Sequence, residues 1–394
     1  MPLAISDNKP VDKKTIFSLG IISAIGHASL SILLPAIPSI SETFNVSTEM
    51  SQLLLSLGFI MMGLGHFCFG LLADRMSHYK LLMSAMVAFA LSNLLMATAQ
   101  SFELLILGRI LQAGSGSACF TLSRIIALSE DDRDTAAKNL SYIILPITLV
   151  PLIAPPIGGI LTDLLNWRWV FYLSSFTGVI GIFLIFFLVP KTSVSQTKTS
   201  EKTLSNIKTL LLSREFNCYN GHHCFTVAAT YAINAATPFI IITSMGYSPS
   251  EFGTFAMLPA LGSIVGAFLG ARLVKRMGGD SLIIYGSIIA ISSYGLILVS
   301  GLLGALSPWS IYLPMIMISF TNTLLLPSST TGALTNHPGL SGTGSGLMGI
   351  TQWILTGILV QLTATQLEHS EITALAIAFI CYLVAVGCFY AARK

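Results

Sequence analysis

Long apolar runs, separated by short polar segments, make up most of the chain. A helix needs about 20 mostly apolar residues to cross a bilayer, and it satisfies its own backbone hydrogen bonds in lipid. Twelve runs reach this length, at 15–38, 51–72, 79–99, 103–125, 140–162, 168–189, 218–241, 252–273, 281–303, 309–331, 343–365 and 371–391. The pattern therefore predicts an all-α membrane protein with twelve transmembrane helices.

The longest polar segment, 190–217, divides these runs into six and six. It contains KTSVSQTKTSEKT and shows no apolar periodicity, so we predict a linker loop between six-helix bundles at 1–189 and 218–394. The halves also repeat weakly, because Gly and a basic cluster follow the second run of each half (GLLADRMSHYK, 70–80, and GARLVKRMGGD, 270–280). Two pseudo-symmetric bundles of this kind are typical of transporters with a site at the midplane between the halves.

The positions of Lys and Arg predict the orientation. Of the 20 basic residues, all but two fall at the termini or in the even-to-odd loops. Arg168 falls on the other side, and Arg109 lies inside a run. Because loops rich in Lys and Arg stay in the cytoplasm, we expect a multi-pass protein of the cytoplasmic (inner) membrane. Both termini and the linker loop are expected in the cytoplasm.

Composition excludes several broad classes of protein. Hydrophobic residues make up 53% of the chain and charged residues 9%, against about 25% charged in a soluble domain. This excludes a soluble enzyme and a nucleic-acid-binding module, and the six cysteines lack the paired spacing of a disulfide scaffold. A membrane-embedded acyl or glycosyl transferase is the alternative from another class. Such an enzyme needs sizeable extramembrane loops, and most loops here are short, so we expect no enzyme.

The loop after the second run resembles a motif of the major facilitator superfamily. GLLADRMSHYK follows the pattern G-x-L-A-D-R-x-G-R-x-[KR] at Gly70, Leu72, Ala73, Asp74, Arg75 and Lys80. It departs from the pattern at Ser77 and His78, where Gly and Arg are usual. In that family the loop latches the halves in the outward-open state. The resemblance therefore implies a conformational latch formed by Gly70, Asp74, Arg75 and Lys80.

Further motifs occur in the order that this resemblance requires. RILQAGSGSA (109–118) matches an Arg-x-x-Gln pattern of the fourth helix. APPIGG (154–159), which supplies Pro155, Pro156, Gly158 and Gly159, resembles the antiporter motif of the fifth. In the second half, ARLVKRMG (271–278), LLPSSTTGAL (325–334) and GTGSGLMGITQ (342–352) look like patterns of the bicyclomycin-resistance-like branch. The chain thus resembles the twelve-helix drug:proton antiporters of that branch over essentially its whole length.

The resemblance implies a secondary active transporter that works by rocking of two bundles. We expect proton-coupled efflux of small amphiphilic compounds, with the bilayer, a small-molecule substrate and protons as partners. A dedicated metabolite or siderophore carrier, in either direction, is the alternative within the same class. We expect a monomer without a cofactor, a metal or a nucleic-acid partner.

One departure from the branch concerns the proton carrier. Ser31 stands in SILLPAIP (31–38) where the branch usually has an acidic residue, and none of the 17 acids lies near the centre of a run. This weakens any role in exporting permanent cations. His27 lies one turn before Ser31 on the same helical face, and its unperturbed pKa of about 6.5 permits titration across a physiological gradient. His27 is the candidate proton carrier; a neutral, hydrogen-bonded histidine is the alternative.

Arg109 is the one charge well inside a run. Such a charge costs roughly 2.5–3.5 kcal/mol to insert, so it is a candidate functional residue. We expect Arg109, with Gln112 one turn away, to contact an anionic group and to share a cavity with His27. The alternative is a structural arginine that binds carbonyls at a helix end or reaches Glu103.

Three further features are weaker. Pro146, Pro151, Pro155 and Pro156 predict a broken or kinked fifth helix with a gating role, although a kink alone is also possible. The adjacent Gly158 and Gly159 predict close packing against a neighbouring helix. CYNGHHC (218–224) clusters Cys and His, but its spacing fits no zinc pattern. His66 is predicted to be structural, through a hydrogen bond between helices.

Overall fold

The computed structural model describes residues 12–73, 75–127, 133–191 and 203–393, and all of their regular secondary structure is helical. In the N-terminal half the helices are α1 (Lys13–Ser31), the short η1 (Leu34–Ala36), α2 (Ile37–Phe44), α3 (Thr48–Ala73), α4 (His78–Ala97), α5 (Phe102–Ala127), α6 (Arg133–Leu164) and α7 (Arg168–Leu188). In the C-terminal half they are α8 (Thr203–Leu212), α9 (Arg214–Pro238), η2 (Phe239–Ser244), α10 (Pro249–Ala256), α11 (Leu258–Met277), α12 (Gly279–Leu302), α13 (Pro308–Thr335), η3 (Pro338–Leu340), α14 (Ser341–Leu367) and α15 (Glu371–Ala392).

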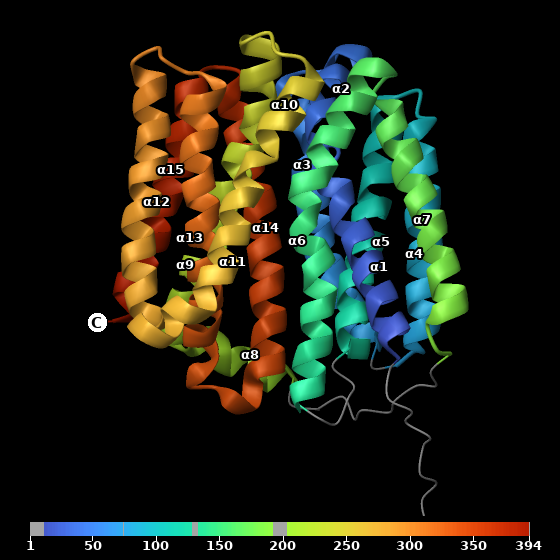
Figure 1. The fold of residues 1–394 in the computed structure, drawn as a ribbon, viewed down its shortest axis with the longest axis vertical. Coiled ribbons are helices and arrows are strands. Elements are labelled where there is room, and N and C mark those ends of the chain that lie inside the picture. The colour runs from blue at the N-terminus through green and yellow to red at the C-terminus, as the bar shows by residue number, and fades with distance from the viewer. Residues whose placement is uncertain (1–11, 74, 128–132, 192–202, 394) are drawn as a thin grey trace, which may run out of the picture.

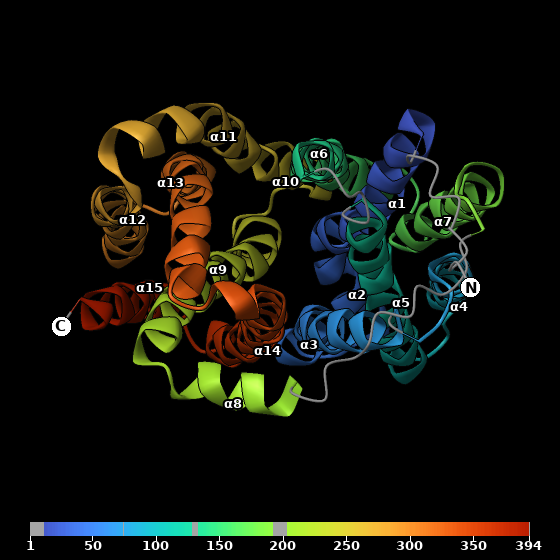
Figure 2. The same ribbon diagram turned by 90° about the horizontal axis from the view of Figure 1, so that it is seen from below.

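These helices form twelve segments that are long and apolar enough to cross a membrane within the described residues, so the predicted count is confirmed. Figure 1 shows them as two bundles side by side, with α1 to α7 in one and α9 to α15 in the other. We call the face that carries Lys13 and Arg393 the proximal face, and the opposite face, which carries Asn45 and Gly304, the distal face. Figure 2 views the molecule from the proximal face.

Proline accounts for the division of the first and the eighth span. The first span ends its regular helix at Ser31 and resumes as α2, because Pro35 and Pro38 have no N–H to donate to the preceding turn. The eighth span likewise changes from α10 to α11 at Pro259. The fifth span is not broken as predicted, since α6 continues as one helix through its four internal prolines; the predicted kink stays a prediction. Helices packed on either side hold such a segment helical despite the missing donors.

The linker loop predicted at 190–217 contains a helix. α8 packs against α9 and α14, and its Leu210 is buried in the hydrophobic cluster of the C-terminal bundle. The seventh span begins at Arg214, four residues before the predicted start of the second bundle. The segment between the end of α7 and the start of α8 is therefore 189–202.

The bundles are packed together at the distal face. A hydrophobic cluster built on Leu33, Leu54 and Phe59 of the N-terminal bundle also includes Phe239 and Val360 of the C-terminal bundle. The contacts that make this closure decide where the cavity between the bundles can open.

Candidate functional site

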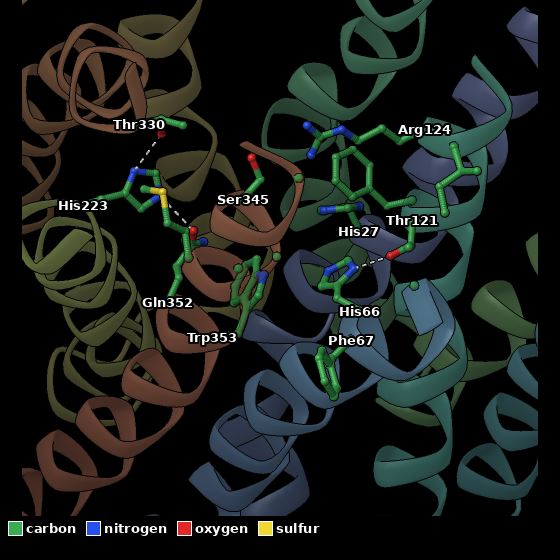
Figure 3. Close-up of a pocket in the computed structure, with 17 residues that line it drawn as sticks. His27, His66, Phe67, Thr121, Arg124, His223, Thr330, Ser345, Gln352 and Trp353 are labelled. Atoms are coloured by element: carbon green, nitrogen blue, oxygen red, sulfur yellow. Dashed lines mark hydrogen bonds between the residues drawn. The ribbon is translucent and has the colours of Figure 1, made fainter. Parts of the chain in front are cut away.

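A central cavity lies between the two bundles. Its proximal part has a volume of about 660 Å³ and its distal part about 380 Å³, and His27, Gln352 and Trp353 line both parts. Figure 3 shows the proximal part, with α5 and α1 side chains facing those of α9, α13 and α14. The side chains that line the cavity from the described residues include three imidazoles and one guanidinium, but no carboxylate.

The seam between α3 and α14 closes one side of the cavity. Gly357 leaves room for α3, since a Cβ on it would lie 2.6 Å from the Ser56 carbonyl oxygen, and a Cβ on Gly63 would lie 2.9 Å from Cβ of Trp353. Ser56 Oγ also donates to Gln361 Oε1 at 2.7 Å. Towards the proximal end, Gly70 has no heavy atom within 4 Å of a Cβ position. The two helices therefore diverge there, and the cavity reaches the proximal ends of α3, α5 and α14.

The seam between α6 and α10 closes the opposite side. A Cβ on Gly159 would lie 2.2 Å from the Pro249 carbonyl oxygen, and a Cβ on Gly253 would lie 2.5 Å from the Pro155 carbonyl oxygen. Both clashes are with backbone atoms of the other bundle. Glycine at these two positions thus lets the two helices touch, backbone against backbone.

Two carboxylates reinforce this distal closure, and both accept from a helix N-terminus of the other bundle. Asp163 Oδ2 accepts from the Ser250 N–H at 2.9 Å, and Glu368 Oε1 accepts from the Glu49 N–H at 2.9 Å. Ser250 and Glu49 are second residues of α10 and α3, where amides have no partner inside the helix and the dipole favours an anion. We refer to Asp163 and Glu368 with these amides as the distal caps.

The distal caps are related by the repeat of the fold. Asp163 lies at the end of the fifth span and caps the eighth, whereas Glu368 lies at the end of the eleventh and caps the second. In both capped helices the preceding serine bonds to the third amide: Ser248 Oγ accepts from Glu251 N–H, and Ser47 Oγ from Met50 N–H. The same capping arrangement is thus present twice: an acid of each bundle caps a helix of the other bundle.

Neutralising both cap carboxylates is expected to shift the protein towards a distally open state. Each negative charge contributes about 0.3–1 kcal/mol at an exposed helix N-terminus, so Asp163→Asn combined with Glu368→Gln should change the ratio of open to closed protein roughly threefold or more. Hydrogen–deuterium exchange of peptides spanning Glu49 and Ser250 measures this ratio.

The control for this double variant is Glu103→Gln. Glu103 is an acid at the same face, and it makes no hydrogen bond to the C-terminal bundle in the described part of the chain. Its loss should leave exchange at both helix N-termini unchanged. Equal exchange in the double variant and the wild type would show that the caps add nothing to closure.

Two histidines from the N-terminal bundle border the cavity and share one aromatic neighbour. The rings of His27 and His66 lie edge-on to Phe120, at centroid distances of 5.3 and 5.9 Å. His27 Nδ1 lies 3.0 Å from the Ser23 carbonyl oxygen, which only accepts, so Nδ1 carries a proton and donates. In the neutral ring, Nε2 of His27 therefore holds the free lone pair.

A third histidine faces them from the C-terminal bundle. His223 Nε2 lies 2.9 Å from Gln352 Oε1, and its Nδ1 lies 3.3 Å from Thr330 Oγ1 (Figure 3). Its neighbour His222 points elsewhere, is fully buried and bonds to Ser329. The two histidines of CYNGHHC thus face different surroundings.

Arg109 lies inside the N-terminal bundle and does not line the cavity. Its side chain is 0% exposed. Nε donates to the Leu54 carbonyl oxygen at 2.8 Å and Nη1 to that of Ser29 at 3.3 Å and to Gln112 Oε1. A Cβ on Gly58 would lie 2.9 Å from Nε, so this glycine makes room for the guanidinium. The expected cavity shared by Arg109 and His27 is therefore not found in this conformation.

Comparison with known proteins identifies the family. The sequence profile described as Major Facilitator Superfamily matches residues 19–361. The chain belongs to this superfamily.

Relatives and solved structures of the superfamily cover nearly the full length. The chain is 24% identical to the bicyclomycin resistance protein homolog of Haemophilus influenzae, over 95% of each chain. It is 26% identical to multidrug resistance protein D of Escherichia coli, over 89% of this chain and 88% of that one. A bacterial homolog of the human lysosomal transporter Spinster, inward-facing and unoccupied, superposes with a TM-score of 0.80 over 98% of both chains at 15% identity. These matches confirm the family and fold expected from the motifs.

The superfamily motifs take different places in the structure. Ser31 lines the distal part of the cavity, while Gln112 is buried and links Arg109 to Asn93 on α4. Gly70 lines the proximal part, and Arg75 and Lys80 are exposed at the proximal face. Asp74, the acid of the predicted latch, lies outside the described residues.

The motif of the fifth helix divides its contacts between the two bundles. Pro155 lines the cavity. A Cβ on Gly158 would lie 2.1 Å from the Ile32 carbonyl oxygen inside the N-terminal bundle, whereas Gly159 contacts α10 across the interface. Pro156 faces α10 as well, 2.9 Å from a Cβ on Gly253. The predicted close packing therefore includes the contact between halves.

Sequence reasoning missed several residues of this major facilitator cavity. Arg124, His223, Gln352 and Trp353 line it, yet none was singled out as a site residue. Two of these had a signal: Gln352 ends the motif GTGSGLMGITQ, and Arg124 is a basic residue near the proximal end of a span that also carries Arg109.

Proposed function

We propose that this protein is a secondary active transporter of the cytoplasmic membrane that exports small amphiphilic compounds in exchange for protons. The observation that carries the proposal is the cavity between the bundles, sealed at the distal face and open towards the proximal face. By the distribution of Lys and Arg, the proximal face is cytoplasmic. The cavity in this conformation thus receives its substrate from the cytoplasm.

Relatives support export rather than another activity. The two curated relatives above are named for bicyclomycin and multidrug resistance. The distal part of the cavity is largely apolar and carries a few amide and hydroxyl groups, which include Asn234, Asn322 and Thr230. Such walls suit a molecule with an apolar body and a small number of polar groups.

We assign the exchange of proton and substrate to Nε2 of His27. His27 lines both parts of the cavity, and the lone pair of Nε2 can hold either a proton or a hydrogen-bond donor of the substrate. Binding of one excludes the other at the same atom. A proton entering from the distal side would therefore displace substrate, as exchange requires.

The test of transport is a set of proteoliposomes that contain the purified protein and an imposed pH gradient. Amphiphilic compounds should accumulate against their gradient when the lumen is acidic, and the accumulation should collapse with a protonophore. A protein that moves none of a chemically diverse set of amphiphiles, with or without the gradient, would overturn the proposal.

His27→Gln is expected to bind substrate without the pH dependence of the wild type. In the wild type, protonation of Nε2 as the pH is lowered should weaken binding. Glutamine keeps an acceptor oxygen in place of the lone pair but does not titrate, so its affinity should stay constant. Equilibrium binding in detergent over a series of pH values measures the difference. Retention of full proton-driven transport by His27→Gln would move the coupling to another residue.

A further inference from the structure

Arg124 is a cation of the cavity wall that the proposed exchange does not use. It comes from the proximal end of α5, and its guanidinium extends towards the middle of the cavity (Figure 3). It makes no hydrogen bond or ion pair with another described residue. This contrasts with Arg109, one charge on the same helix that is buried and bound on several sides.

Among the described residues, no acid lines the cavity around Arg124. The described side chains that line the proximal part of the cavity include His66 and His223 but neither Asp nor Glu, and the distal part is lined by no charged side chain. A free guanidinium offers parallel N–H donors that match the oxygen atoms of a carboxylate, sulfonate or phosphate. The charge of the cavity therefore favours an anionic group near the proximal end.

Aromatic rings provide the other end of the site. Phe59 lies 4.8 Å from Tyr231 and 5.6 Å from Trp353, and Tyr231 lies 5.6 Å from Trp353, measured between ring centroids. These rings come from α3, α9 and α14 and line the distal part of the cavity. They present flat apolar surface, against which an aromatic body can stack.

We infer that the substrates are amphiphilic anions, in which one oxyanion binds Arg124 and an aromatic body packs among Phe59, Tyr231 and Trp353. A hydrogen-bond donor elsewhere on the same molecule binds Nε2 of His27, so that protonation of His27 still displaces the substrate. The inference rests on the proposed function, because it names the class of molecule that the same cavity carries. It also assigns Arg124 a role in selecting substrates. A cationic amphiphile lacks a carboxylate partner in the described part of the cavity and meets the guanidinium charge at the proximal end.

Three probes with one aromatic body test the class. Naphthaleneacetate is an anion, naphthaleneacetamide is neutral, and naphthylethylammonium is a cation. The wild type should bind the anion at least tenfold better than the amide, and the cation least well. The variant Arg124→Gln should lose about tenfold in affinity for the anion and leave affinity for the amide unchanged. Arg124→Lys, which keeps the charge but not the paired donors, should fall between them.

The matched control is Arg272→Gln. Arg272 lies over the ring of Phe268 on α11, and it does not line the cavity. This variant should bind all three probes as the wild type does. Because the guanidinium of Arg124 has no described partner, its replacement should also leave the thermal unfolding midpoint unchanged, which separates loss of binding from loss of fold.

The outcomes separate this inference from the proposed function. Transport of the amide or the cation in preference to the anion, or equal loss of all three probes in Arg124→Gln, would refute the anionic class and leave the transporter in place. Failure of the wild type to bind or move any of the probes, whatever their charge, would count against the proposed function itself.

Discussion

Gly159→Leu is expected to reduce transport to background while the protein still inserts in the membrane. The new side chain would meet Pro249 and Ser250, since even a Cβ lies within 3 Å of three of their backbone atoms. Backbone atoms of a packed helix cannot move aside as a flexible side chain does, so α6 and α10 must separate. The protein would then fail to close at the distal face, and alternating access would stop.

Transport by proteoliposomes and hydrogen–deuterium exchange at the start of α10 measure the two effects. Gly295→Leu is the matched control, because Gly295 lies inside a spanning helix and has no heavy atom within 4 Å of a Cβ position. Gly158→Leu makes a second comparison: it meets Ile32 inside the N-terminal bundle, so thermal stability should fall instead. Transport at the wild-type rate by Gly159→Leu would show that close contact between α6 and α10 is not required for transport.

Arg109→Met is expected to destabilise the N-terminal bundle strongly. The substitution removes the donors from the carbonyl groups of Leu54 and Ser29 and from Gln112, which in turn bonds to Asn93. Hydrogen bonds from a charged donor are worth about 1.5–3 kcal/mol each, and buried acceptors left without a partner add to the loss. We therefore expect the free energy of unfolding to fall by roughly 3 kcal/mol or more.

Thermal unfolding in detergent, together with substrate binding at several pH values, tests this role. Arg109→Lys should lie between the wild type and Arg109→Met, because an ammonium group replaces some of the donors. The sequence alone instead placed Arg109 in the cavity as a contact for an anionic group, so that its loss would mainly weaken substrate binding. An unchanged unfolding midpoint combined with lost binding would restore that site role.

The number and order of the helices could be predicted because each apolar run of about 20 residues corresponds to one spanning helix. The rotation of each helix about its axis could not, since spans that are apolar on every side carry little directional pattern. This explains why Arg109, expected in the cavity, lies between α1, α3 and α5, while Arg124 on the same helix faces the cavity. The helix α8 was missed because it has only 10 residues and follows directly on a polar stretch.

Small residues were predicted more successfully than polar ones. Gly158 and Gly159 were expected at a close helix contact, because two adjacent glycines in a spanning helix have few other uses. Which of the two faces the other bundle depends on the packing of α6 between α1 and α10. The hydrogen-bond partners of Asp163 and Glu368 could not be predicted either, because they are backbone amides distant in sequence.

The distal caps also bear on how such a fold can originate. Each half supplies one acidic acceptor at the end of its fifth helix and one free amide at the start of its second. Two identical copies of a six-helix unit, meeting face to face about a two-fold axis, would form both caps at once, because each copy carries both complementary groups. A gene duplication and fusion would thus preserve a closure that the ancestral dimer already possessed, leaving the cavity-lining residues free to diverge.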